Sequence, residues 1–121
     1  MRKRGPETAA FKRAIEEFQC FVASVSVYEL LFGISKGGGI TDEDKLLALL
    51  TSVPFDENEA RLAAAIHRDL IQRNAEIGPK DVMIAASCLA NGLPLLTANA
   101  RHFRRVPQLQ VIAAEEFVAT P

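Results

Sequence analysis

Four polar residues of this chain stand beside apolar runs and could share one chemistry. Glu29 lies within the apolar stretch at residues 25–32, and Asp81 directly precedes the apolar stretch at residues 82–86. Thr97 and Asn99 follow another apolar run, at residues 93–96. Burying an unpaired carboxylate is costly, so each acid needs a partner or an ion. Oxygen ligands of this kind suit Mg²⁺ or Mn²⁺ rather than zinc.

Each of these residues also has a structural interpretation. Asp81 could be an acid that favours the N-terminus of a helix through the helix dipole. Glu29 could be a rim residue on a half-buried helix. Thr97 and Asn99 could simply form a turn, since Asn favours such positions. The residue types alone therefore leave a metal site and ordinary helix and turn chemistry both open.

Histidine and arginine residues add further candidates. His67 has polar neighbours and is expected at the surface, whereas His102 could contact a substrate phosphate or have a structural role. Basic residues cluster at both ends of the chain, and such clusters either hold a phosphate backbone or are solvated surface charge. The clusters are Arg2, Lys3 and Arg4, and Arg101, Arg104 and Arg105.

The elements that must position these residues follow from hydrophobic spacing. Helical periodicity, capping residues and short apolar runs predict helices alternating with strands. We expect helices at 6–17, 26–33, 46–50, 56–72, 81–90 and 115–118, strands at 20–25, 53–55, 93–96 and 109–112, and a turn or short helix at 99–103. This order predicts an α/β fold with a mainly parallel sheet, whose functional residues gather at the carboxyl ends of the strands.

Composition narrows the class of protein. The chain has 121 residues, 49% of them apolar, which predicts one globular domain spanning residues 1–121. Its net charge of −1 argues against a globally basic nucleic-acid binder. Without an apolar run of spanning or signal-peptide length, we expect a cytoplasmic protein with no membrane contact. Cys20 and Cys88 lack metal-ligand spacing and are expected to be reduced core cysteines.

The order of four segments resembles the PIN-domain family, and within it the VapC-type toxins of bacterial toxin–antitoxin pairs. These segments are VSVYELLFG at residues 25–33, VPFD at 53–56, IGPKDVMIAA at 77–86 and NGLPLLTANARHF at 91–103. The resemblance covers nearly the whole chain. It implies a three-layer α/β fold with a mainly parallel central sheet flanked by helices.

The same resemblance implies an endoribonuclease that uses Mg²⁺ or Mn²⁺. Glu29 and Asp81 match metal-binding acids of the family, and Thr97 and Asn99 match the polar positions after its fourth strand. Arg101, Arg104 and Arg105 then become candidate contacts to RNA phosphates. The resemblance also implies a cognate antitoxin as partner and a homodimer.

One departure from the family pattern sets a second hypothesis beside the enzyme. The family begins with an apolar strand ending in an Asp, whereas Met1 to Glu7 here resembles the stretch after that segment. With Glu29 and Asp81 as its two acids, we expect the chain as written to be poorly active, unstable, or completed by a partner. A start site assigned too far downstream and a degenerate remnant would both explain this. The alternative function is a catalytically inactive remnant that binds an antitoxin or its own copy through amphipathic helices at 7–18 and 42–50.

Overall fold

The computed structural model describes residues 6–32 and 42–119 of the chain. The described residues exclude the basic cluster Arg2–Arg4, the glycine-containing stretch at 36–39 and Thr41. The elements in chain order are α1 (Pro6–Glu17), β1 (Phe21–Ala23), α2 (Ser24–Phe32), α3 (Asp42–Leu47), β2 (Thr51–Val53), α4 (Glu57–Gln72), α5 (Pro79–Ala90), β3 (Leu95–Thr97), α6 (Ala100–Phe103), β4 (Val111–Ala113) and α7 (Ala114–Ala119).

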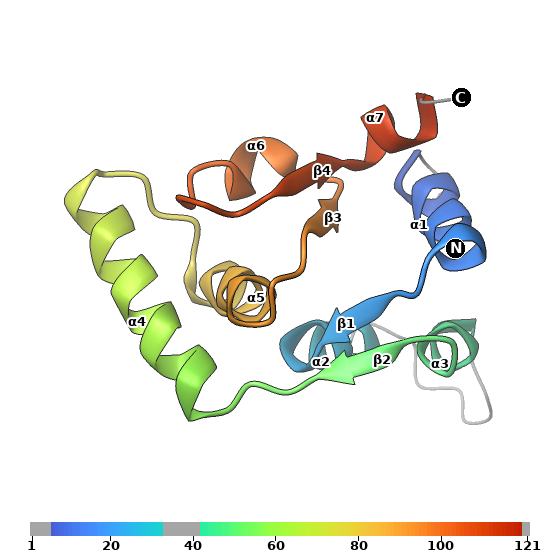
Figure 1. Ribbon diagram of the computed structural model, residues 1–121, viewed down its shortest axis with the longest axis horizontal. Coiled ribbons are helices and arrows are strands. Elements are labelled where there is room, and N and C mark those ends of the chain that lie inside the picture. The colour runs from blue at the N-terminus through green and yellow to red at the C-terminus, as the bar shows by residue number, and fades with distance from the viewer. Residues whose placement is uncertain (1–5, 33–41, 120–121) are drawn as a thin grey trace.

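The alternation of helices with parallel strands confirms the expected α/β class. β1 pairs with β2 in parallel, with Val22 opposite Ser52, and β3 pairs with β4 in parallel, with Leu96 opposite Ile112. The strands form two sheets of two strands each, rather than the single central sheet that the spacing predicted. β1 and β3 lie on the facing sides of the two sheets, with no described strand between them (Figure 1). The facing edges therefore lack a ladder partner within residues 6–32 and 42–119.

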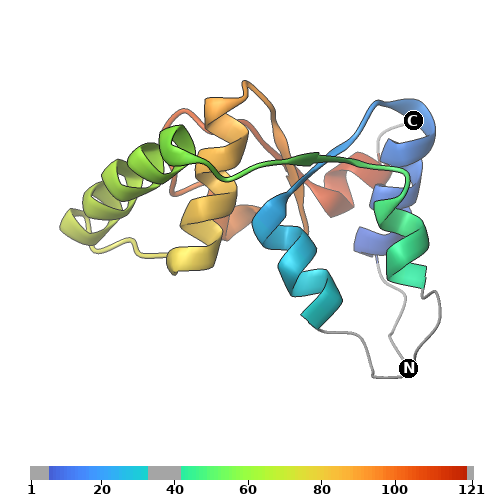
Figure 2. The same cartoon turned by 90° about the horizontal axis from the view of Figure 1, so that it is seen from below.

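The core lies where α4 and α5 pack against each other. α4 carries Ala63, Ile66 and Leu70 on its buried face, at the spacing of an amphipathic helix. α5 is apolar on nearly all sides, and Val82, Ile84, Ala85 and Ala86 are buried in the same cluster. Figure 2 shows the two helices side by side at one end of the molecule. This packing fixes the first turn of α5, which begins with Pro79 at a position where its missing N–H costs nothing.

The first and last helices lie together at the other end. Arg13 of α1 donates a hydrogen bond to the carbonyl oxygen of Phe117 at 2.7 Å, and its guanidinium lies 5.0 Å from the centre of the Phe117 ring. Ala10 and Ala14 are buried on the same helix, and Figure 1 shows α1 beside α7. This face of α1 is thus used for packing within the chain. None of the described helices is both long and apolar enough to span a membrane.

Candidate metal and RNA site

The two acids singled out in the sequence line the same cavity. This cavity has a volume of about 280 Å³, and both Glu29 and Asp81 belong to its wall. Glu29 comes from α2, which starts at Ser24 directly after β1 ends at Ala23. Asp81 lies in the first turn of α5. The two polar positions after β3, Thr97 and Asn99, line the cavity as well, so the structure brings all four candidates together.

Local backbone chemistry explains how Thr97 and Asn99 reach this cavity. Thr97 is the last residue of β3, and its Oγ1 accepts a hydrogen bond from the backbone N–H of Asn99 at 3.0 Å. Asn99 then occupies the N-cap position of α6, but its side chain makes no capping hydrogen bond. The amide of Asn99 is therefore not used to hold the helix. The turn interpretation of this segment therefore holds, and the turn places both polar residues at the wall of the cavity.

His102 is bound to Asp81, a contact that the sequence did not reveal. Its Nε2 lies 3.0 Å from Oδ2 of Asp81 and 2.8 Å from the carbonyl oxygen of Ile77. A carbonyl oxygen can only accept, so Nε2 carries a hydrogen and donates it to Ile77, while Oδ2 of Asp81 lies within ion-pair distance of the same nitrogen. His102 therefore fixes the orientation of the Asp81 carboxylate and ties α6 to the segment before α5. The signal was its position three residues after Asn99, within the same helical turn.

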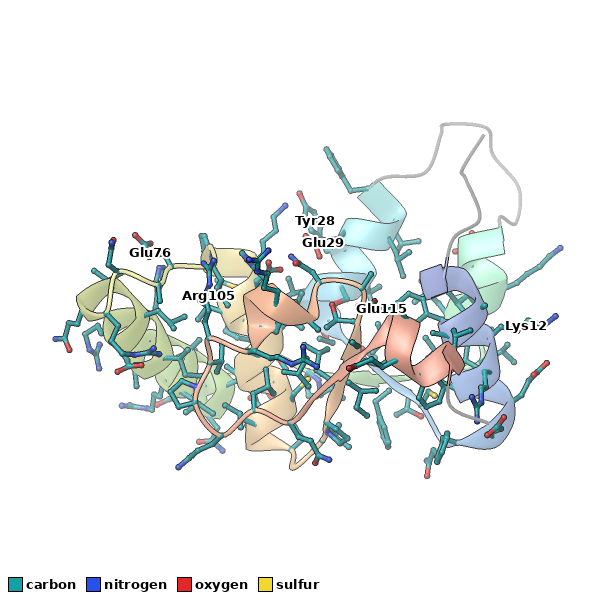
Figure 3. All side chains as sticks on the ribbon, turned by 90° about the horizontal axis from the view of Figure 1, so that it is seen from above. Lys12, Tyr28, Glu29, Glu76, Arg105 and Glu115 are labelled. Carbon is teal, nitrogen blue, oxygen red and sulfur yellow. The ribbon has the colours of Figure 1, made fainter. Side chains whose placement is uncertain are left out.

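Lys80 is the second residue that the sequence did not single out. Its Nζ lies 3.9 Å from Oε2 of Glu29 and 5.6 Å from the centre of the Tyr28 ring. Each candidate acid thus has one basic neighbour, Lys80 for Glu29 and His102 for Asp81. Figure 3 shows Tyr28 and Glu29 beside each other on α2.

The remaining candidates lie away from this pair of acids. Arg104 pairs with Glu116 at 3.2 Å, and Arg105 donates to the carbonyl oxygen of Glu76 at 2.9 Å (Figure 3). Arg101 is exposed and has no hydrogen bond or ion pair to a described residue. His67 is bound to Glu76 rather than to the site, with 3.4 Å between Nε2 and Oε1.

Both cysteines are free, as expected, although neither is fully buried. Burial raises the pKa of the Cys88 thiol to about 11 and raises the pKa of Cys20 as well. Both thiols are therefore protonated near neutral pH, which makes them poor nucleophiles and poor metal ligands.

The side-chain oxygens at this cavity fit a hard divalent cation that keeps several of its water ligands. No group of three or more His, Cys, Asp or Glu residues that could hold a metal is found in the described part of the chain. Mg²⁺, however, is usually held by one or two carboxylates and keeps several waters or substrate oxygens. Glu29 and Asp81 supply two carboxylates, and Asn99 supplies a neutral oxygen at the same cavity. The described contacts of Asp81 use Oδ2, so Oδ1 is the oxygen that can face a cation.

An α/β domain with parallel strand pairs and two carboxylates on the wall of one cavity defines the class of this protein. The model of the PIN domain matches residues 3–109, and the chain belongs to the PIN-domain family. Among its relatives, the ribonuclease VapC of Rickettsia bellii (strain RML369-C) is 32% identical over 104 residues, which span 78% of this chain and 75% of the relative.

Solved structures share the fold at lower sequence identity. One is VapBC2 from Rickettsia felis bound to a DNA fragment from their promoter, with a TM-score of 0.71 and 23% identity over 84% of this chain and 80% of that chain. Another is VapBC-5 from Mycobacterium tuberculosis, described as a member of the VapBC family of toxin–antitoxin systems. It has a TM-score of 0.57 and 22% identity over 77% of this chain and 79% of that chain. The fold expected from the sequence is confirmed by these likenesses.

Proposed function

We propose that this chain is a Mg²⁺- or Mn²⁺-dependent endoribonuclease, the toxin of a type II toxin–antitoxin pair. The observation that carries the proposal is the cavity in which Glu29 and Asp81 meet Thr97 and Asn99. The Rickettsia bellii relative, named a ribonuclease VapC, supports RNA as the substrate. Structural neighbours that are VapBC complexes support an antitoxin as partner. A homodimer and a cytoplasmic location are part of the same proposal.

The residues of the site would divide the work as follows. Glu29 and Asp81 would hold the cation, which when bound lowers the pKa of a coordinated water and neutralises phosphate charge. His102 keeps the Asp81 carboxylate in one orientation, because it holds Oδ2 while also bound to the carbonyl oxygen of Ile77. Asn99 can orient a water or contact a substrate oxygen, since its side chain is not spent on capping. Arg101, Arg104 and Arg105 would contact RNA phosphates.

Cleavage of a structured RNA by the purified chain tests this function. We expect cutting with Mg²⁺, none with EDTA, and a large loss in Asp81→Asn. Asp69→Asn is the matched control, because Asp69 lies on α4 and pairs with Arg73 at 2.7 Å. Cleavage that survives Asp81→Asn, or that proceeds in EDTA, would refute the site assignment.

A second candidate, an inactive domain that binds an antitoxin, is favoured by one observation. Both acids already have basic neighbours, Lys80 at 3.9 Å from Glu29 and His102 at 3.0 Å from Asp81, so the ammonium group of Lys80 can balance one of the two charges without a metal ion. This candidate predicts antitoxin binding that does not depend on metal, together with no RNA cleavage in Mg²⁺. An antitoxin encoded beside this chain would be the partner to test.

A further inference from the structure

Two aromatic rings on α2 are exposed to solvent in a stacked arrangement. The centres of the Tyr28 and Phe32 rings lie 5.7 Å apart, and their planes differ by 19°. Tyr28 is 54% exposed and Phe32 is 77% exposed. The pair therefore packs on itself rather than into the core. Large apolar groups held together in water at one place indicate a surface that binds something.

Helical spacing places this pair beside the candidate site. Phe32 is four residues after Tyr28 and three residues after Glu29, and residues at these separations are neighbours on one helix face. Glu29 lines the cavity that also holds Asp81. Figure 3 shows Tyr28 and Glu29 next to each other at the surface. A molecule whose reacting group reaches Glu29 therefore has the two rings within its reach.

The side chain of Lys80 contacts both the Tyr28 ring and the Glu29 carboxylate. The Nζ atom of Lys80 lies 5.6 Å from the centre of the Tyr28 ring and 3.9 Å from Glu29, and the Lys80 side chain is 59% exposed. A lysine in this position can hold a phosphate that lies between the rings and the carboxylates. Aromatic faces, an adjacent ammonium group and a candidate hydrolytic site together match the parts of one nucleotide: base, phosphate and scissile bond.

We propose that Tyr28 and Phe32 form a stacking platform for an unpaired nucleobase, with Lys80 holding a neighbouring phosphate of the same strand. The inference rests on the proposed ribonuclease function and assigns the residues that would bind the RNA strand beside the point of cleavage. Proteins that bind single strands stack bases on aromatic side chains, whereas the bases of an A-form duplex stay in the helical stack. The site would thus select loops, bulges and ends over continuous duplex.

Binding of a fluorescent RNA tests the platform without requiring cleavage. The probe is a short oligouridylate with one central 2-aminopurine, whose fluorescence falls when the base stacks on a ring. Ca²⁺ replaces Mg²⁺ in the binding buffer, and the same RNA annealed to its complement serves as the duplex. The variant Tyr28→Leu/Phe32→Leu keeps apolar side chains at both positions but removes the rings. Phe18→Leu is the matched control, because Phe18 is 59% exposed and pairs with Phe117 at the other end of the molecule.

We expect the wild-type chain and Phe18→Leu to quench the probe and to prefer it to the duplex. The double variant should lose the quenching and bind roughly 5- to 150-fold more weakly, the range for loss of a base–aromatic stack. Phe32→Tyr, which retains a ring, should restore binding in the presence of Tyr28. Lys80→Met should reduce the slope of log affinity against log salt by about 0.7, the value for one lost contact to a single strand.

Three results would overturn the platform: equal affinity and quenching in the double variant, preference for the duplex, or no binding of the single strand by the wild-type chain. If the double variant binds RNA normally but self-associates less in sedimentation, the rings form a protein contact and the proposal is wrong. A chain that cleaves RNA with Mg²⁺ yet tolerates the double substitution refutes the platform alone. A chain that stacks the probe but cleaves no RNA refutes the nuclease proposal alone.

Discussion

Replacing His102 with alanine perturbs the site and the fold through one atom. Its Nε2 donates to the carbonyl oxygen of Ile77 at 2.8 Å and lies 3.0 Å from Oδ2 of Asp81. A neutral hydrogen bond contributes about 0.5–1.5 kcal/mol, and a partly exposed ion-pair contact contributes about 0.2–1 kcal/mol. The side chains of His102 and Asp81 are 26% and 29% exposed, so the lower halves of these ranges apply. We therefore expect His102→Ala to lower the free energy of unfolding by about 1 kcal/mol.

Two measurements read out this change separately. For a domain of this size, about 1 kcal/mol corresponds to a fall in Tm of roughly 4 °C. Loss of a residue that orients a metal ligand typically weakens metal affinity by about 10- to 100-fold. Titration with Mn²⁺, followed by the electron paramagnetic resonance signal of the free ion, measures that affinity without any substrate. His102→Gln can donate to one of the two oxygens and should recover part of both effects.

His67→Ala is the matched histidine control. His67 is bound to Glu76 at 3.4 Å, outside the cavity, and its side chain is 30% exposed. Its replacement should leave Mn²⁺ affinity unchanged. If His102→Ala matches this control in both Tm and Mn²⁺ affinity, the contacts of His102 do not position Asp81 and the reasoning fails. If Tm falls while Mn²⁺ affinity stays the same, His102 supports the fold alone.

Three further predictions concern stability and RNA contact. Glu59 is 8% exposed, and its carboxylate accepts a hydrogen bond from the backbone N–H of Asp56 at 2.9 Å. Glu59→Ala should therefore lower the free energy of unfolding by about 1–2 kcal/mol, measured by urea denaturation. An unchanged urea midpoint would contradict this prediction. Burial raises the pKa of Cys88 from 9.0 to about 11, so its contribution to stability is complete below pH 9 and falls as pH rises toward 11, by roughly 1.4 kcal/mol per pH unit. Cys88→Ala should remove that part of the slope when unfolding is followed against pH; a slope equal to wild type would show that the thiol is not the cause. Arg101→Ala should weaken RNA binding and reduce its salt slope by about 0.7, and an unaltered slope would remove Arg101 from the phosphate contacts.

Helix positions were predictable because local signals agree with the packing. The expected helix at residues 6–17 coincides with α1 (Pro6–Glu17), and the expected helix at 56–72 differs from α4 (Glu57–Gln72) only by its N-cap residue. Proline in the first turn marks the start of α1, and an acid pair marks the start of α4. α5 (Pro79–Ala90) begins two residues before the expected Asp81, since Gly78 rather than Lys80 is its N-cap.

Strand positions were less predictable, because short apolar runs carry no sharp end signals. The run at residues 20–25 predicted a strand, but the strand ends at Ala23 and α2 begins at Ser24, where Ser24 rather than Ser26 starts the helix. β2 (Thr51–Val53) begins two residues before the expected strand at 53–55 and ends at Val53, because Pro54 lacks the N–H that a strand ladder needs. The division into two sheets depends on which strands meet in space, and periodicity along the chain carries no information about that.

The sequence singled out residues that line one cavity, but it did not predict their contacts. Strand-end reasoning and the family resemblance both pointed to Glu29 and Asp81, which line one cavity with Asn99. The partners Lys80 and His102 were not assigned to the acids, because a contact across 21 residues, as between Asp81 and His102, leaves no periodic trace. For Arg104 and Arg105, the sequence indicated a cluster of positive charge, whereas the structure shows that both residues contact other parts of the chain.

The most direct test of the account is the rate of RNA cleavage at saturating Mg²⁺ for the wild-type chain, Glu29→Gln, Asp81→Asn and Asp69→Asn. If Glu29 and Asp81 hold the cation that activates water, both site variants should be slower by roughly 100-fold or more, as expected for loss of several kcal/mol of stabilisation. Asp69→Asn should match wild type, and EDTA should abolish cleavage in every sample. Metal-dependent cleavage at equal rates in all four proteins would contradict the account, since the catalytic acids would then lie elsewhere.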